Sequence, residues 1–203
     1  MGVKSGIPTN IDWVIYNFYK NSKKYTDKIK IINNFEKKYL TFKYPENSLI
    51  FLPYINYGGS ISPFVNLNSR AEIFGILPHH NNFDIMTACY EGLALSIKDC
   101  FANKIKSKES LYLAGGASNS KILPQLISSI LNIKVKILTN SELGALGIAF
   151  LIDSYLHQKD LKKLINDHQN IGHIYTPQRK HSKYLKNKYH KYKKLRQSLN
   201  NIW

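Results

Sequence analysis

Residues 111–151 read LYLAGGASNSKILPQLISSILNIKVKILTNSELGALGIAFL, and this stretch decides the fold class. Its pattern predicts a strand at 111–114, a tight Gly-Gly-Ala-Ser turn, an apolar helix at 122–131 and a second strand at 134–138. A strand, a helix and a second strand in this order predict a right-handed crossover between parallel strands. The expected fold class is therefore α/β.

The helix that closes this stretch is apolar on nearly every side between Leu143 and Ile152. A helix of that kind is normally covered all round, so we expect it to be buried. The four residues before it, Thr139 to Glu142, match the capping-box pattern, in which a hydroxyl and a carboxylate satisfy the first free N–H groups of a helix.

Upstream of this stretch, residues 84–101 show the most regular amphipathic pattern in the chain. Gly92 lies on the apolar stripe, and a mid-helix glycine costs about 1 kcal/mol relative to alanine. We therefore expect a neighbouring backbone to pass close to Gly92. Cys89 and Cys100 share this predicted helix with Cα atoms ~16 Å apart, too far for a disulfide. Shorter patterns predict helices at 11–18 and 27–39 and strands at 49–52 and 71–76.

The formal net charge of +16 over 203 residues invites a nucleic-acid interpretation. The charge is uneven: residues 1–43 carry nine basic and three acidic side chains, residues 44–156 carry eight of each, and residues 157–203 carry twelve and two. Only three of the basic residues are arginines, although arginine is the usual reader of phosphates and bases. This distribution favours solvated lysine surfaces over a nucleic-acid footprint.

These shifts in charge and pattern divide the chain into three parts. We expect a helical lead-in at residues 1–43, an α/β nucleotide-binding core at 44–156 and a basic helical tail at 157–203. Apolar residues in the tail recur at helical spacing and predict one helix that packs this stripe on the core and turns its lysines outward. The stripe consists of Leu185, Tyr189, Tyr192, Leu195 and Leu199.

Two small-residue turns are the candidates for ligand binding. Gly115 and Gly116 lie between a strand and a helix, where glycine lets a ligand approach the backbone and the helix N-terminus favours an anion such as phosphate. Gly144 and Ala145 begin the next helix and leave room for a flat ring one turn in. Close packing of helix on sheet explains small residues equally well, so both interpretations stay open at this point.

The ordered motifs of the chain resemble the FGGY carbohydrate kinases, and in particular their C-terminal domain. LPYINYGGSISPFVNLNSRAEIFGI at 52–76 is similar to the family's LP(Y/F)-x-x-GERSP loop and ARG strand, and residues 71–91 are similar to its second signature. LYLAGGASNSKILPQLISSIL at 111–131 resembles the phosphate and adenosine segment, and SELGALGIAFL at 141–151 resembles the E-x-GALGAA segment. The tail from Tyr175 to Leu195 is similar to the family's closing Pro and Tyr-rich helix.

This resemblance implies an actin-like (ribonuclease H-like) ATPase fold, ATP and Mg as cofactors, and phosphorylation of a pentulose or related sugar or polyol. The motif order is closest to the xylulose and L-xylulose branch. Gly115 and Gly116 would face the ATP phosphates, and Ser120 would lie beside the adenosine. Glu142 and Gly144 would border the adenine end.

The resemblance also implies what this chain lacks. In the family the catalytic base and the magnesium carboxylates belong to the N-terminal domain, so we expect no catalytic residue, no metal ligand and no kinase activity from this chain alone. The family's Gly-Glu-Arg loop reads Tyr57-Gly58-Gly59-Ser60 here, and its usual Trp is Leu123. Arg70 keeps the family's Ala-Arg position, where a structural role is expected.

Three origins fit these expectations: a remnant of a decayed kinase gene, the second half of a split kinase whose N-terminal half is another chain, or an incomplete copy of the gene. The alternative function is a lysine-rich domain that binds nucleic acid or an anionic surface without catalysis. The sequence has no apolar window of membrane-spanning length and no signal peptide at its start, so we expect a cytoplasmic protein without a membrane partner.

Overall fold

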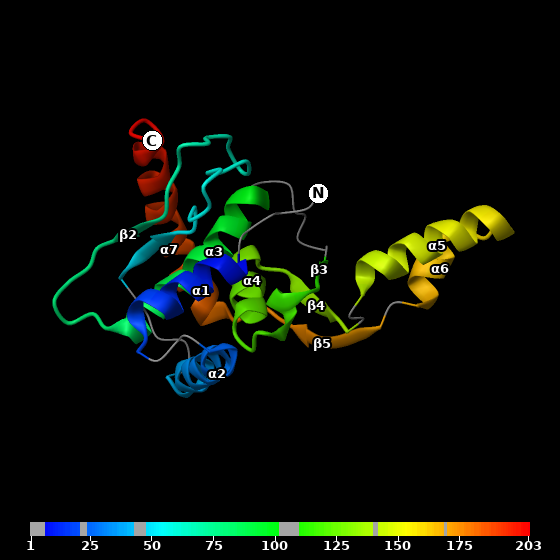
Figure 1. Ribbon diagram of the computed structural model, residues 1–203, viewed down its shortest axis with the longest axis horizontal. Helices are drawn as coiled ribbons and strands as arrows, with labels where there is room; N and C mark the ends of the chain where they lie inside the picture. Colours follow the sequence, from blue (N-terminus) through cyan, green and yellow to red (C-terminus); the bar gives the residue numbers. More distant parts are fainter. Residues whose placement is uncertain (1–6, 21–23, 43–47, 102–109, 140–141, 169) are drawn as a thin grey trace.

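The structure is a computed structural model that describes residues 7–20, 24–42, 48–101, 110–139, 142–168 and 170–203. Its elements follow one another in the order shown in Figure 1. They are α1 (Ile7–Phe18), α2 (Tyr25–Thr41), β1 (Ile50–Leu52), β2 (Glu72–Phe74), α3 (Asn82–Phe101), β3 (Ser110–Leu113), the 3-10 helix η1 (Gly116–Asn119), α4 (Leu123–Leu131), β4 (Lys134–Leu138), α5 (Leu143–His157), α6 (Leu161–Asp167), β5 (Ile171–Tyr175) and α7 (Arg179–Leu199).

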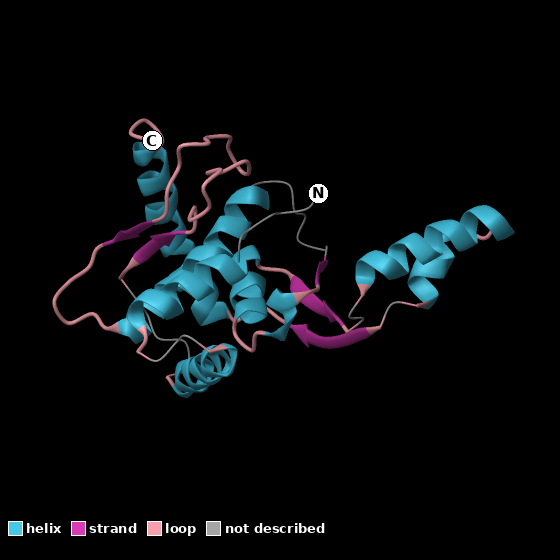
Figure 2. Ribbon diagram, in the orientation of Figure 1, coloured by secondary structure: helices cyan, strands magenta, loops and turns pink. Residues whose placement is uncertain are grey.

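The strands form two small sheets, drawn in magenta in Figure 2. β1 and β2 are an antiparallel pair, and β3, β4 and β5 form a three-stranded sheet in that order. β3 and β4 run parallel, with Leu111 opposite Val135 and Leu113 opposite Ile137. This pairing confirms the parallel crossover that the sequence predicts. β5 adds on the far side of β4 in the antiparallel direction.

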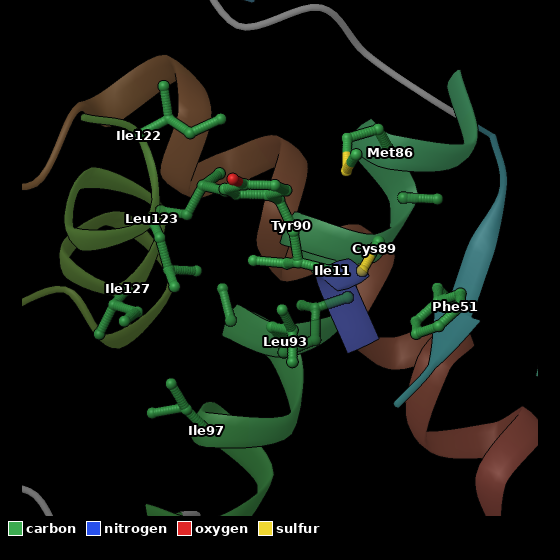
Figure 3. Packing of buried hydrophobic residues seen from close by; sticks show 14 of the residues in the cluster. Ile11, Phe51, Met86, Cys89, Tyr90, Leu93, Ile97, Ile122, Leu123 and Ile127 are labelled. Carbon is green, nitrogen blue, oxygen red and sulfur yellow. The ribbon is translucent and has the colours of Figure 1, made fainter. Parts of the chain in front are cut away.

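Helix α3 forms the centre of the hydrophobic core. It contacts α1, α4, α7 and β1, and most of its side chains are buried, including Cys89, Tyr90 and Leu93. Figure 3 shows these three side chains lying between Leu123 of α4 and Phe51 of β1. Cys89 and Cys100 are both free thiols, as their spacing along the helix predicts.

The expected close approach to Gly92 is confirmed. A Cβ atom at this position would lie 2.3 Å from the carbonyl oxygen of Phe51, so only glycine lets β1 lie against the helix at this distance. The contact joins the small two-stranded sheet to the centre of the core.

The tail helix α7 packs on the core as predicted. Leu185 and Tyr192 have no exposed surface, and the other members of the stripe are partly buried against the same cluster. The expectation that its lysines all face outward is wrong for Lys188, which is buried and forms an ion pair with the fully buried Glu91 of α3. Arg196 forms a second pair with Asp99, at 2.6 Å between Nε and Oδ2. Charges placed inside a helix interface need such partners.

The expectation for residues 143–152 is wrong: none of the residues of α5 is buried. Figure 1 shows α5 and α6 extending together beyond the three-stranded sheet. Among the described residues α5 packs chiefly against α6, so no second layer covers its apolar surface. The apolar pattern of a helix shows which of its faces can be buried. It does not show whether another segment lies against those faces, which is why burial of α5 could not be predicted from its sequence.

The capping box is also wrong in its described part. α5 begins after Glu142, whose side chain makes no capping hydrogen bond, and the hydroxyl of Thr139 donates to the carbonyl oxygen of Asn170 instead. Asn140 and Ser141 lie outside the described residues. The sequence pattern did not predict α6 or β5. Within the described ranges, none of the helices combines the length and apolar composition that a bilayer crossing requires.

Candidate nucleotide-binding site

The parallel pairing of β3 and β4 places both glycine turns at one edge of the sheet. Parallel strands present their carboxyl ends on the same side, which is where α/β sheets generally bind ligands. Gly115 and Gly116 follow the end of β3, and Glu142 and Gly144 follow the end of β4. The two candidate turns, far apart in sequence, therefore lie at the same edge of the three-stranded sheet.

The first turn has a backbone that requires glycine at one position. Gly115 has φ +73° and ψ −160°, a conformation essentially restricted to glycine. Its carbonyl oxygen accepts hydrogen bonds from both the backbone N–H and the hydroxyl of Ser118, at 3.0 and 2.6 Å, which close the turn. No heavy atom beyond the adjoining residues lies within 4 Å of a Cβ built at Gly115 or Gly116, so their backbone faces open space.

Ser120 lies at the end of this turn, where its hydroxyl is fully engaged. It accepts from the N–H groups of Ile122 and Leu123, at 3.3 and 3.0 Å, where the chain enters α4. It donates to Oε1 of Glu36 at 2.6 Å. Through these bonds the Ser120 hydroxyl holds the turn in place.

Glu36 of α2 is a residue of this region that sequence reasoning missed. The residue is only 2% exposed, and its carboxylate, besides the bond from Ser120, accepts the N–H of Lys121 at both oxygens, at 3.2 and 3.1 Å. The only available signal was its position beside Phe35 on the buried side of a predicted helix. Glu36 ties the lead-in helix α2 directly to the glycine turn.

The second turn borders an apolar hollow of about 160 Å³ between β4, α5 and α6. The residues of α5 that line it are Leu143, Leu146, Gly147 and Phe150. His168, just after the end of α6, lines it as well. Gly144 and Ala145, at which the sequence places such a hollow, are instead exposed, and Gly144 has no heavy atom within 4 Å of a built Cβ. Glu142 is exposed at the start of the helix.

The structure also places two residues that depart from the family motifs, Leu123 and Tyr57, and one that keeps them, Arg70. Leu123 is completely buried at the start of α4, and the side chain of Tyr57 is fully exposed in the loop between β1 and β2. Arg70 donates to the carbonyl oxygens of Leu67 and Ser69, at 3.1 and 2.9 Å, so it fixes the junction of loop and strand as expected. No group of three or more acidic, histidine or cysteine side chains that could hold a metal ion occurs in the described part of the chain.

Comparison with known proteins identifies the arrangement. Residues 9–152 match the model of the FGGY family of carbohydrate kinases, C-terminal domain. An erythritol kinase of Brucella abortus is 32% identical over 104 residues, which are 51% of this chain and 20% of that protein. A probable L-xylulose kinase of Haemophilus influenzae is 25% identical over 196 residues, which are 95% of this chain and 37% of that protein.

Solved structures agree with this assignment at the level of the fold. A gluconate kinase and a ligand-bound xylulose kinase from Lactobacillus acidophilus each superpose with a TM-score of 0.78 at 22% identity, over 95% of this chain and 38% of theirs. These likenesses confirm the actin-like α/β fold that the motifs imply. The chain thus spans well under half the length of these relatives. It belongs to the FGGY family of carbohydrate kinases, and residues 9–152 form that family's C-terminal domain.

Proposed function

We propose that this chain is the ATP-binding half of a cytoplasmic FGGY-type kinase that transfers a phosphoryl group to a hydroxyl of a pentulose or a related sugar or polyol. The observation that supports the proposal is the position of the two glycine turns, which follow the carboxyl ends of the adjacent parallel strands β3 and β4. The motifs that match the family's nucleotide segments lie in these turns.

The residues present fit a nucleotide. The open backbone at Gly115 and Gly116 leaves room for phosphate oxygens to approach, and the exposed Gly144 leaves the start of α5 open toward the adenine end. In this proposal Ser120 acts by holding the turn, because its hydroxyl is already bonded, and Glu142 borders the adenine end. Bound ATP would supply the phosphoryl group, with Mg held by carboxylates outside this chain.

The same proposal includes inactivity of the chain alone. Phosphoryl transfer depends mainly on positioning and on stabilisation of charge by groups that close around the nucleotide from both sides. One half of such a cleft positions ATP but supplies no base for the acceptor hydroxyl. We therefore propose a partner that carries the N-terminal half of the kinase.

Binding of ATP to the full chain tests the nucleotide assignment directly. We expect ATP to shift the amide signals of residues 115–118, and we expect Gly116→Asp to weaken binding at least tenfold, because it sets a negative charge where the phosphates lie. Gly58→Asp is the matched control: Gly58 is also exposed with nothing within 4 Å of its Cβ, but it lies in the β1–β2 loop. Equal ATP affinity in both variants would contradict the assignment.

Activity is tested by co-expression with the upstream reading frame and a panel of ketopentoses and polyols. We expect ATP turnover only in the co-expressed sample and only with an acceptor sugar or polyol. Turnover clearly above background by this chain alone would refute the proposed division of the active site.

A further inference from the structure

The N-terminal end of α4 follows directly after the glycine turn and has its own capacity to bind an anion. The first backbone N–H groups of a helix have no partner inside the helix, and together with the helix dipole they attract negative charge. A phosphate group bound beside Gly115 and Gly116 would ordinarily use these N–H groups. In this chain they are already engaged.

The backbone groups at which the chain enters α4 offer nothing to an external anion. The N–H of Lys121 donates to both carboxylate oxygens of Glu36, at 3.2 and 3.1 Å. The N–H groups of residues 122 and 123 donate to the hydroxyl of Ser120, which itself donates to Oε1 of Glu36 at 2.6 Å. Pro124, the next residue, has no N–H group. Every N–H group of this short stretch therefore has an acceptor within the chain.

Glu36 brings to this end of α4 the negative charge that a bound anion would otherwise bring. A carboxylate is favoured at the positive end of a helix, and hydrogen bonds to a charged acceptor are stronger than those between neutral groups. The residue is 2% exposed, so these hydrogen bonds replace the water that would solvate its carboxylate elsewhere. Glu36 belongs to α2 and is 84 residues away from Ser120 in sequence, so the lead-in helix supplies this charge.

We propose that Glu36 is a positioning residue of the nucleotide site: its carboxylate fills the anion position at the end of α4 and confines the phosphates of ATP to the open backbone of Gly115 and Gly116. This inference rests on the proposed function, because it takes ATP to be the ligand of the glycine turn. The backbone at both glycines faces open space, whereas the N–H groups that follow Ser120 are bonded. Phosphoryl transfer is sensitive to the position of the phosphates. Helix α2 therefore takes part in positioning the nucleotide.

Removal of the carboxylate tests whether it occupies an anion position. Glu36→Ala leaves the hydroxyl of Ser120 and the N–H of Lys121 as free donors. Formate carries the same carboxylate group as a small anion, so we expect about 100 mM formate to raise the melting temperature of Glu36→Ala by about 3–5 °C and to leave that of wild type unchanged.

Phe35→Ala is the matched control for this measurement. Phe35 is the neighbouring residue of α2 and is similarly buried, at 4% exposed, but its side chain is apolar and its removal frees no hydrogen-bond donor. We expect formate to give this variant no stabilisation. A Glu36→Ala variant that does not respond to formate, or an equal response in both variants, would overturn the proposal.

The position of the phosphates is measured in wild type, so the test does not depend on the folding of Glu36→Ala. We expect inorganic phosphate and ATP to shift chiefly the amide signals of residues 115–118, with smaller shifts at 120–123. In Glu36→Ala inorganic phosphate should also shift residues 120–123 strongly, because donors at Ser120 and Lys121 are then free. Glu36→Gln keeps the shape of the side chain and an acceptor oxygen, and should therefore keep the wild-type pattern.

The same titrations separate this inference from the proposed function. ATP shifts in wild type that are as large at residues 120–123 as at 115–118 would overturn the role of Glu36 and leave the nucleotide assignment standing. Stabilisation of Glu36→Ala by formate without any ATP response in wild type would support the occupied end of α4 and contradict the nucleotide assignment.

Discussion

The missing side chain of Gly92 decides how closely α3 can approach β1. Replacing it with alanine would set a Cβ atom 2.3 Å from the carbonyl oxygen of Phe51, and this backbone atom cannot move aside without shifting the strand. The gain in helix propensity, up to about 1 kcal/mol, is too small to offset such overpacking.

We therefore expect Gly92→Ala to lower the free energy of unfolding by about 1–3 kcal/mol, measured by urea denaturation. Gly147→Ala is the matched control, because Gly147 lies within α5 and nothing lies within 4 Å of its built Cβ. That substitution should raise stability by about 0.5–1 kcal/mol. A loss of stability at both positions would show that the contact with Phe51 is not the cause.

Glu36 supports the glycine turn through buried hydrogen bonds. We expect Glu36→Ala to leave the hydroxyl of Ser120 and the N–H of Lys121 without their acceptor, and to cost about 1–3 kcal/mol of stability by urea denaturation. Glu142→Ala removes an exposed carboxylate and should change stability by less than about 0.5 kcal/mol. ATP affinity should also fall in Glu36→Ala if this carboxylate sets the geometry of the turn, and an unchanged affinity would assign it to stability alone.

At the scale of elements, α7 is held on the core by apolar contacts and by buried polar groups that face α3. Tyr189 donates to Oδ1 of Asp99 at 2.8 Å, next to the Arg196–Asp99 pair, and Tyr184 and Lys188 meet at Glu91. The sequence predicted the apolar stripe because its spacing is regular. It did not predict the ion pairs, because the sequence around a lysine does not show which carboxylate of another helix will lie next to it in the fold.

The first turn of α7 makes the stability of the fold sensitive to acid. Burial lowers the pKa of His181 from 6.5 to about 4, since the charged ring is poorly solvated there. The unfolded chain therefore binds a proton between pH 6.5 and 4 that the folded chain does not bind. Stability is complete above pH 6.5 and falls as the pH drops toward 4.

We expect this effect to reach about 2–3 kcal/mol, measured by urea denaturation at pH 7.5, 5.5 and 4.5. His181→Phe should flatten the pH dependence in this window, because no ring nitrogen is left to titrate. His190 lies exposed on the same helix, and His190→Phe controls for the loss of a histidine side chain from α7. An equal slope in wild type and His181→Phe would rule out His181 as the source.

At the scale of the whole molecule, the net charge of +16 is the feature that first suggested nucleic acid. The two glycine turns proposed to bind the nucleotide lie in the neutral middle of the sequence, and the basic excess lies in its two flanks. Lys188 and Arg196 are engaged with carboxylates of α3, so they are unavailable to an external anion. The remaining lysines of α7 are exposed to solvent.

We expect only weak, non-specific binding of a duplex DNA of 20 base pairs, with no complex at about 1 µM chain and physiological salt by fluorescence anisotropy. Poly-lysine of similar charge is the positive control. Submicromolar binding that falls steeply with salt would instead favour the anionic-surface alternative.

Local spacing and ordered motifs were enough to predict the order of elements as far as α5, the parallel crossover, the close approach at Gly92 and the family of the chain, whereas α6 and β5 were missed. Tertiary structure alone decided that Glu36 supports the glycine turn, that Lys188 is buried and that α5 is uncovered. The physical reason is the same in each case. Burial and hydrogen bonding of a residue depend on which other segment lies against it. Apolar residues on every side of α5 show only that the helix could be buried, and its sequence does not specify a segment that buries it.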